Sequence, residues 1–202
     1  MELLTIPLWI LVYQLISISN NNIKRNIMST IHSLVAIYLC LNDYHITIFY
    51  WSSSYYIYDL VMQLLSSSGL LSASTMTLAL HHIIAIYTLE YFKLGENELT
   101  YIFTYMFMLL EISNIPVYIM YYWKQICKDK PDMNNFIKNF ITKILLMCEI
   151  LSFMLMRLTY SLYLLLINYH LFTMDLIFIS LFLYLLSLFW WINMLYQIKK
   201  VN

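Results

Sequence analysis

Two adjacent histidines, His81 and His82, lie in the middle of an apolar stretch, LALHHIIAIY. A second apolar stretch, LLEISNIP, carries the carboxyl group of Glu111. A neutral imidazole both donates and accepts hydrogen bonds, and a nearby carboxylate orients it and raises its basicity. Such groups suit proton abstraction from an alcohol or amine, or nucleophilic attack on an activated acyl group. His81, His82 and Glu111 are therefore the candidate catalytic residues.

Ionisable residues recur inside five consecutive apolar stretches. In chain order they are His32, Asp59, the His pair, Glu111, and Glu149 with Arg157. On insertion scales an Asp, Lys or Arg at the centre of a bilayer costs about 2.5–3.5 kcal/mol, and intramembrane ionisable side chains face a bundle interior or a wet cavity. The series predicts a polar cavity that several helices share. Its candidate substrate-binding residues are His32, Asp59, Ser113, Asn114 and Arg157.

Helical spacing groups some of these residues. Asp59 and Gln63 are four residues apart and share one helix face, and Glu111 and Asn114, three apart, share another. Pro116 removes a backbone hydrogen bond near Glu111, which suits a kink or a wet site.

Structural roles are alternatives for the same residues. Asp59 and Arg157 would form an ion pair that holds two helices together, and His32 would be an interhelical hydrogen bonder. The His pair would be polar glue between helices, and Glu149 is better explained by packing or cavity lining. Neighbouring helix positions do not easily reach one ion, so we expect no metal site.

The composition is that of an integral membrane protein. Of 202 residues, 62% are hydrophobic and only 11% are charged, whereas soluble domains are about a quarter charged. The formal net charge is zero, so nucleic acid is not an expected partner. The cysteines, Cys40, Cys127 and Cys148, are odd in number and form no CxxC motif, which supports neither a disulfide framework nor a zinc site.

The apolar runs predict an all-α polytopic fold with about seven transmembrane helices. We read Leu3–Ser19 as a retained first helix because no basic residue precedes it and no cleavage site follows. After the polar loop NNNIKRN, the remaining spans are approximately 27–41, 54–71, 74–91, 99–122, 140–167 and 171–196. A basic loop, WKQICKDKPDMNNFIK, separates the fifth span from the sixth.

The distribution of basic residues predicts the orientation. With the N-terminus outside the cytosol, cytosolic segments hold eight of the eleven Lys and Arg residues, and the opposite side holds only Lys93. The C-terminus is then cytosolic. The terminal KKVN, residues 199–202, resembles a dilysine retrieval signal of the endoplasmic reticulum; the alternative is an ordinary basic helix flank.

Five segments in chain order resemble the TLC-domain family, which includes ceramide synthases and translocating-chain-associated membrane proteins. They are RNIMSTIHSLVAIY, YYIYDLVMQLL, LALHHIIAIY, LLEISNIPVYIMYYW and FMLMRLTYSLYLL. The resemblance implies a first helix with its loop in residues 1–23. A TLC-like domain would follow in residues 24–200, with helices two to seven in a ring around the cavity.

The resemblance is closer to the less-characterised TLC-domain proteins than to ceramide synthases. Ceramide synthases carry a His-Asp step after the His pair, but the segment between His82 and Glu111 has neither His nor Asp. The implied function is lipid handling, either lipid binding or regulation of membrane lipid composition. The alternative is an acyl-CoA-dependent sphingolipid or phospholipid acyltransferase that uses the His pair.

Membrane lipids are the expected partners in both cases, and the sequence leaves a homo-oligomer open. No cofactor is expected, with acyl-CoA as the co-substrate of the enzyme alternative. A transporter ranks third, because the chain shows no inverted repeat or paired broken helices.

Overall fold

The computed structural model describes residues 2–18, 20–66, 73–92 and 98–201. These ranges are helical apart from short connections and contain no strand, which confirms the all-α prediction. The chain divides into two compact units, Met1–Tyr105 and Met106–Asn202. The boundary falls within α5 (Glu98–Asp129).

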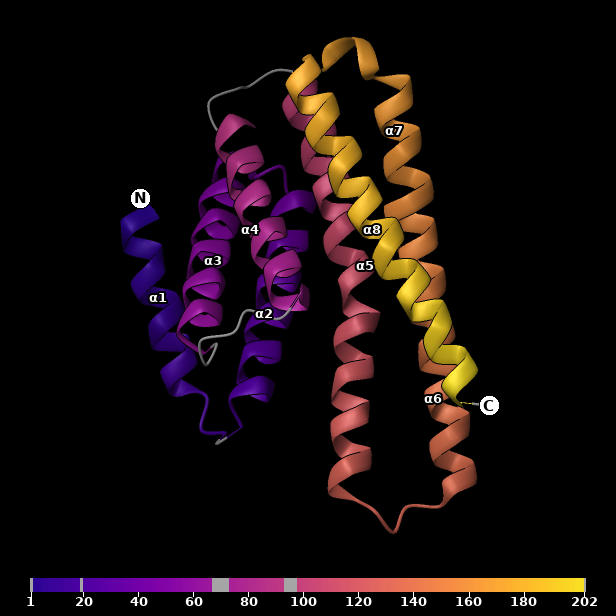
Figure 1. Cartoon of the computed structure of the whole chain (residues 1–202). Helices are drawn as coiled ribbons and strands as arrows, with labels where there is room; N and C mark the ends of the chain where they lie inside the picture. Colours follow the sequence, from indigo (N-terminus) through magenta and orange to yellow (C-terminus); the bar gives the residue numbers. More distant parts are fainter. Residues whose placement is uncertain (1, 19, 67–72, 93–97, 202) are drawn as a thin grey trace. The chain divides into compact units, whose positions relative to one another are not determined.

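Unit 1 is built around α3. It contains α1 (Glu2–Leu15), α2 (Asn21–Leu41), α3 (His45–Ser66), α4 (Ala73–Phe92) and the first turns of α5, and α3 contacts α1, α2 and α4 (Figure 1). The side chain of Trp9 on α1 is fully buried, and its Nε1 donates a hydrogen bond to Ser54 Oγ at 3.2 Å. The first helix is therefore anchored in the core of unit 1.

Unit 2 contains the rest of α5 and three further helical stretches. α6 (Asn135–Ser152), the π-helical segment η1 (Phe153–Tyr160) and α7 (Ser161–Ile167) continue one another without a break. A short 3-10 turn, η2 (Tyr169–Leu171), leads into α8 (Met174–Val201). The core of this unit is an apolar cluster of Met120, Leu146, Ile150, Phe153 and Met194.

Three helices of the described residues are long and apolar enough to cross a membrane. They are Glu98–Asp129, Asn135–Ile167 and Met174–Ile198, and a shorter apolar helix covers Thr5–Leu15. Large apolar side chains, such as Phe178, Leu185 and Phe189 on α8, are more than half exposed. The three helices correspond to the fifth, sixth and seventh predicted spans. α2, α3 and α4 have 21, 22 and 20 residues and are not among these three helices.

The polar segment before the second span is helical, not a loop. α2 begins at Asn21, six residues before the predicted start. The side-chain oxygen of Asn20 accepts a hydrogen bond from Ile23 N at 3.3 Å, as a residue capping a helix N-terminus does. Lys24 and Arg25, which we expected in a connection, therefore lie in the first turns of α2.

Other boundaries also move outward. α3 begins at His45 instead of Ser54, and the end predicted for the third span falls in residues 67–72, outside the described residues. α5 continues to Asp129 because Lys, Gln and Ile favour a helix, and it ends before Pro131. The predicted basic loop thus shrinks to Lys130–Asn134, and Cys127 lies in a helix, not in the loop. The predicted orientation depends in part on Lys93, which lies outside the described residues. The predicted retrieval signal depends on the side chains of residues 199–202, which are not described either.

Candidate functional site

Asp59 is the centre of a buried polar cluster in unit 1, which we define as Arg25, Asp59, Gln63 and His82. Its carboxylate accepts hydrogen bonds from Arg25 Nε at 3.3 Å and from Arg25 Nη2 at 3.1 and 3.3 Å. The side chain of Asp59 is 7% exposed, and that of Arg25 is 26% exposed. Arg25 is not predictable as a site residue from the sequence, because its position between Asn22 and Asn26 is typical of a connection.

Gln63 and His82 complete this cluster. Gln63 Nε2 donates a hydrogen bond to Asp59 Oδ2 at 2.9 Å, which confirms that the two residues share a face of α3. His82 Nδ1 on α4 lies 3.6 Å from the same oxygen, slightly beyond hydrogen-bond distance. One carboxylate thus lies beside a cation, an amide and an imidazole from α2, α3 and α4.

The two histidines have different environments. His82 is buried, whereas His81 is half-buried. The ring of Tyr56 lies 5.2 Å from the His82 ring and 6.4 Å from the His81 ring, measured between centroids. The carboxylate that would orient an imidazole here is Asp59, and the imidazole is that of His82.

His32 belongs to a second polar group in the same unit. Its ring stacks on Tyr55 with centroids 4.1 Å apart, and its Nε2 lies 3.1 Å from Ser52 Oγ. Tyr55 OH in turn lies 2.7 Å from Ser29 Oγ. These contacts link α2 to α3, as the interhelical role considered for His32 requires.

In unit 2, Arg157 binds the stretch of α5 that contains Glu111. Its Nε donates to Ser113 Oγ at 3.1 Å, and its Nη2 donates to Asn114 Oδ1 at 2.9 Å and to Leu110 O at 3.1 Å. Asn114 Nδ2 donates to Glu111 Oε2 at 3.4 Å, which confirms the shared face predicted from their spacing. Arg157 itself lies in the π-helical segment η1, and π-helical turns occur frequently at functional sites.

Glu149, one turn before η1, is buried, and its Oε2 has no hydrogen-bond partner among the described residues. It lies beside Ile150 of the apolar cluster in unit 2. This position agrees with packing or cavity lining, the interpretation that the sequence favours.

Within each unit, several of the predicted site residues lie together. Asp59, His81 and His82 lie together in unit 1, with His32 in the neighbouring group. Glu111, Ser113, Asn114 and Arg157 lie together in unit 2. The described residues contain no group of three or more His, Cys, Asp or Glu side chains that could hold a metal ion.

The arrangement in unit 1 has a definite chemical capacity. An aspartate beside an imidazole favours the tautomer with the proton on the nearer nitrogen and supports the imidazole as a base. The partly exposed guanidinium of Arg25 is planar and suits phosphate or carboxylate oxygens. The cluster is therefore equipped to bind a polar headgroup, and His82 to accept a proton from it.

Comparison with known proteins gives no relative from which a role could be taken: no family model, no curated protein and no solved structure matches this chain significantly.

Proposed function

We propose that this chain is an integral membrane protein that binds a lipid and regulates membrane lipid composition, with the lipid headgroup at the buried polar cluster. The observation that carries the proposal is the burial of Asp59 between Arg25, Gln63 and His82. Ionisable groups at membrane depth are rare and mark functional sites by default. The exposed part of Arg25 is where a headgroup phosphate would bind.

The wider architecture is part of the same proposal. Seven helices cross the membrane, and helices two to seven form a ring around a polar cavity, as the resemblance to TLC-domain proteins implies. The N-terminus lies outside the cytosol and the C-terminus in the cytosol, in the endoplasmic reticulum membrane. In the described residues, three helices are long and apolar enough to cross a membrane, which supports the assignment to a membrane. The distribution of the basic residues supports the orientation.

A second candidate function is an acyl-CoA-dependent lipid acyltransferase. The observation that favours it is the distance of 3.6 Å between His82 Nδ1 and Asp59 Oδ2. His82 would take the proton of a lipid hydroxyl or amine while the oxygen or nitrogen of that group attacks the carbonyl carbon of the thioester. The C–S bond then breaks, an ester or amide forms, and the departing thiolate takes the proton from His82. Lys124, Lys128 and Lys130 would bind the phosphates of coenzyme A.

Lipid retention tests the first function. The purified protein is placed in nanodiscs that contain a defined lipid mixture, and the lipids that stay bound are measured by native mass spectrometry. Asp59→Asn preserves the size of the side chain but removes the carboxylate that holds the Arg25 guanidinium in place, so we expect the retained lipid to fall. Asp132→Asn, on an exposed residue of the α5–α6 connection, is the control with the same change of charge. Equal retention by a folded Asp59→Asn variant would contradict the proposal.

Turnover separates the second function from the first. The same preparations are incubated with labelled acyl-CoA and a panel of sphingoid bases and lysophospholipids. A product that the folded His81→Ala/His82→Ala double variant does not form would establish the acyltransferase. No product from wild-type protein that retains lipid would favour the lipid binder.

A further inference from the structure

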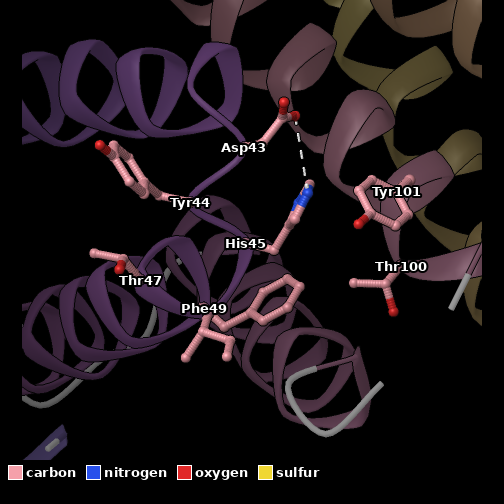
Figure 2. Close-up of a pocket in the computed structure, with 8 residues that line it drawn as sticks. Asp43, Tyr44, His45, Thr47, Phe49, Thr100 and Tyr101 are labelled. Carbon is pink, nitrogen blue, oxygen red and sulfur yellow. Dashed lines mark ion pairs between the residues drawn. The ribbon is translucent and has the colours of Figure 1, made fainter. Parts of the chain in front are cut away.

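A pocket of about 360 Å³ lies at the N-terminal end of α3 in unit 1, and it shares no lining residue with the buried polar cluster (Figure 2). Its wall includes Asp43, His45 and Phe49 from the α2–α3 connection and α3, and Thr100 and Tyr101 from α5. A pocket of this size suits a small organic group. The sequence does not predict this pocket, because Thr100 and Tyr101 lie beside residues 43–49 only in the folded unit.

The end of α2 places Asp43 at the mouth of this pocket. Tyr44 N donates to Leu39 O at 3.0 Å and Asp43 N donates to Cys40 O at 3.2 Å, the paired bonds of a Schellman motif. Asp43 is the residue of that motif with positive φ, 57°, where glycine is usual. Its carboxyl group is largely exposed at the pocket mouth.

His45 lies inside the pocket, between Asp43 and α5. Its Nδ1 lies 3.1 Å from Thr104 Oγ1, and its ring meets the Tyr101 ring edge to face, with centroids 4.4 Å apart. Its Nε2 points toward Asp43, 3.8 Å from Oδ1, and has no hydrogen-bond partner among the described residues (Figure 2). His45 Nε2 thus faces the Asp43 carboxylate at a distance too long for a hydrogen bond.

The described wall of the pocket carries a negative charge and an exposed aromatic ring, that of Tyr101. Asp43 is the one acidic residue among those that line the pocket, and they include no Lys or Arg. The exposed ring of Tyr101 adds a face that attracts cations. A carboxylate beside an aromatic ring suits an organic ammonium ion.

We infer that this pocket binds an organic ammonium group, with its charge against Asp43 and its alkyl groups against Tyr101. The ammonium group belongs either to a lipid headgroup or to a soluble amine, and the recognition chemistry is the same. This site is independent of the buried polar cluster, so its test does not depend on the proposed lipid site at Asp59.

Tetramethylammonium chloride is the probe for the full-length protein in detergent, with binding measured by isothermal titration calorimetry. Asn tolerates positive φ as well as Asp does, so Asp43→Asn removes the charge and keeps the turn. We expect its affinity for the probe to fall about tenfold or more. Asp132→Asn, the control with the same change of charge, should bind as the wild type does. Tyr101→Leu, which keeps Asp43, should also weaken binding, and it serves if Asp43→Asn does not fold.

Nanodiscs of phosphatidylcholine and of phosphatidylglycerol then distinguish the source of the ammonium group. Loss of selective phosphatidylcholine retention in Asp43→Asn, together with loss of probe binding, assigns a lipid headgroup. Loss of probe binding with unchanged retention assigns a soluble amine. No probe binding by the wild type, or equal binding by the wild type and the folded variants, overturns the inference.

Discussion

Arg25 donates hydrogen bonds to both carboxylate oxygens of Asp59, and thereby connects the first turns of α2 to the middle of α3. The two residues are 34 positions apart in the chain. Asp59 is also the acceptor for Gln63 and the neighbour of His82. Arg25 thus compensates the negative charge of Asp59, the residue around which the proposed headgroup site is built.

Replacing Arg25 by Met should destabilise unit 1. The substitution leaves the carboxylate of Asp59 buried without its cation, which costs 3–5 kcal/mol in fully buried pairs and about 2 kcal/mol here, since Arg25 is partly exposed. Thermal unfolding in detergent measures the loss. The double variant Arg25→Met/Asp59→Asn should regain part of the stability, because it removes the unpaired charge. A single variant as stable as the wild type would show that the pair contributes little.

Truncating Trp9 should be among the most destabilising changes in α1. The side chain is fully buried against Trp51 and Tyr55 and bonded to Ser54, so Trp9→Ala should cost about 3–5 kcal/mol. Trp9→Phe keeps most of the apolar contact and should cost less. Leu15→Ala, on a side chain that is 73% exposed, is the control and should have little effect. Equal unfolding temperatures for Trp9→Ala and Leu15→Ala would mean that α1 is not part of the core.

The sequence predicts the helices of this chain better than their ends. The length of each apolar run predicts a helix, and the described part of each of the seven predicted stretches is helical over most of its length. The predicted starts of α2 and α3 are wrong. Residues 20–26 and 45–53 contain polar side chains, which usually favour connections. In the fold their polarity is satisfied locally or across helices, as when Asn20 bonds Ile23 N and Arg25 bonds Asp59.

Contacts within one helix are predictable from spacing, but contacts between helices are not. The Asp59–Gln63 and Glu111–Asn114 hydrogen bonds follow from separations of four and three residues. A spacing rule cannot indicate which distant guanidinium reaches Asp59, because that depends on the rotation and offset of two helices. The sequence suggested Arg157, whereas the structure supplies Arg25. The pocket at Asp43 and His45 escaped prediction for the same reason.

Replacing Arg157 by Lys should weaken the connection between η1 and α5. Lysine keeps the charge but cannot present two nitrogens to Ser113, Asn114 and the Leu110 carbonyl together. Hydrogen bonds to charged groups contribute about 1.5–3 kcal/mol each, so a loss of about 2 kcal/mol is expected in thermal unfolding. Ser113→Ala removes one partner and should cost less. Lys143→Met, on an exposed residue of α6, controls for loss of a positive charge. A stable Arg157→Lys variant would assign Arg157 a role other than this connection.

Cysteine labelling should show whether α2, α3 and α4 cross the membrane as the later helices are expected to. The experiment starts from a variant in which Cys40, Cys127 and Cys148 are replaced by Ala. Single cysteines are then introduced at exposed positions of successive connections or helix ends: Asn21, Asn42, Asp132 and His170. Intact microsomes, with the cytosolic face outward, are treated with a membrane-impermeant maleimide before and after permeabilisation.

With seven spans and a cytosolic C-terminus, the labelling should alternate along the chain. Asn21→Cys and Asp132→Cys should react in intact microsomes, whereas Asn42→Cys and His170→Cys should react only after permeabilisation. If only the three most apolar helices cross, α2 stays on one side and the cysteines at positions 21 and 42 label together. That pattern would show that α2 does not cross the membrane, and the buried polar cluster, to which α2 contributes Arg25, would lose its support as an intramembrane site. The labelling at position 42 therefore decides whether the argument from intramembrane charge applies to the buried polar cluster.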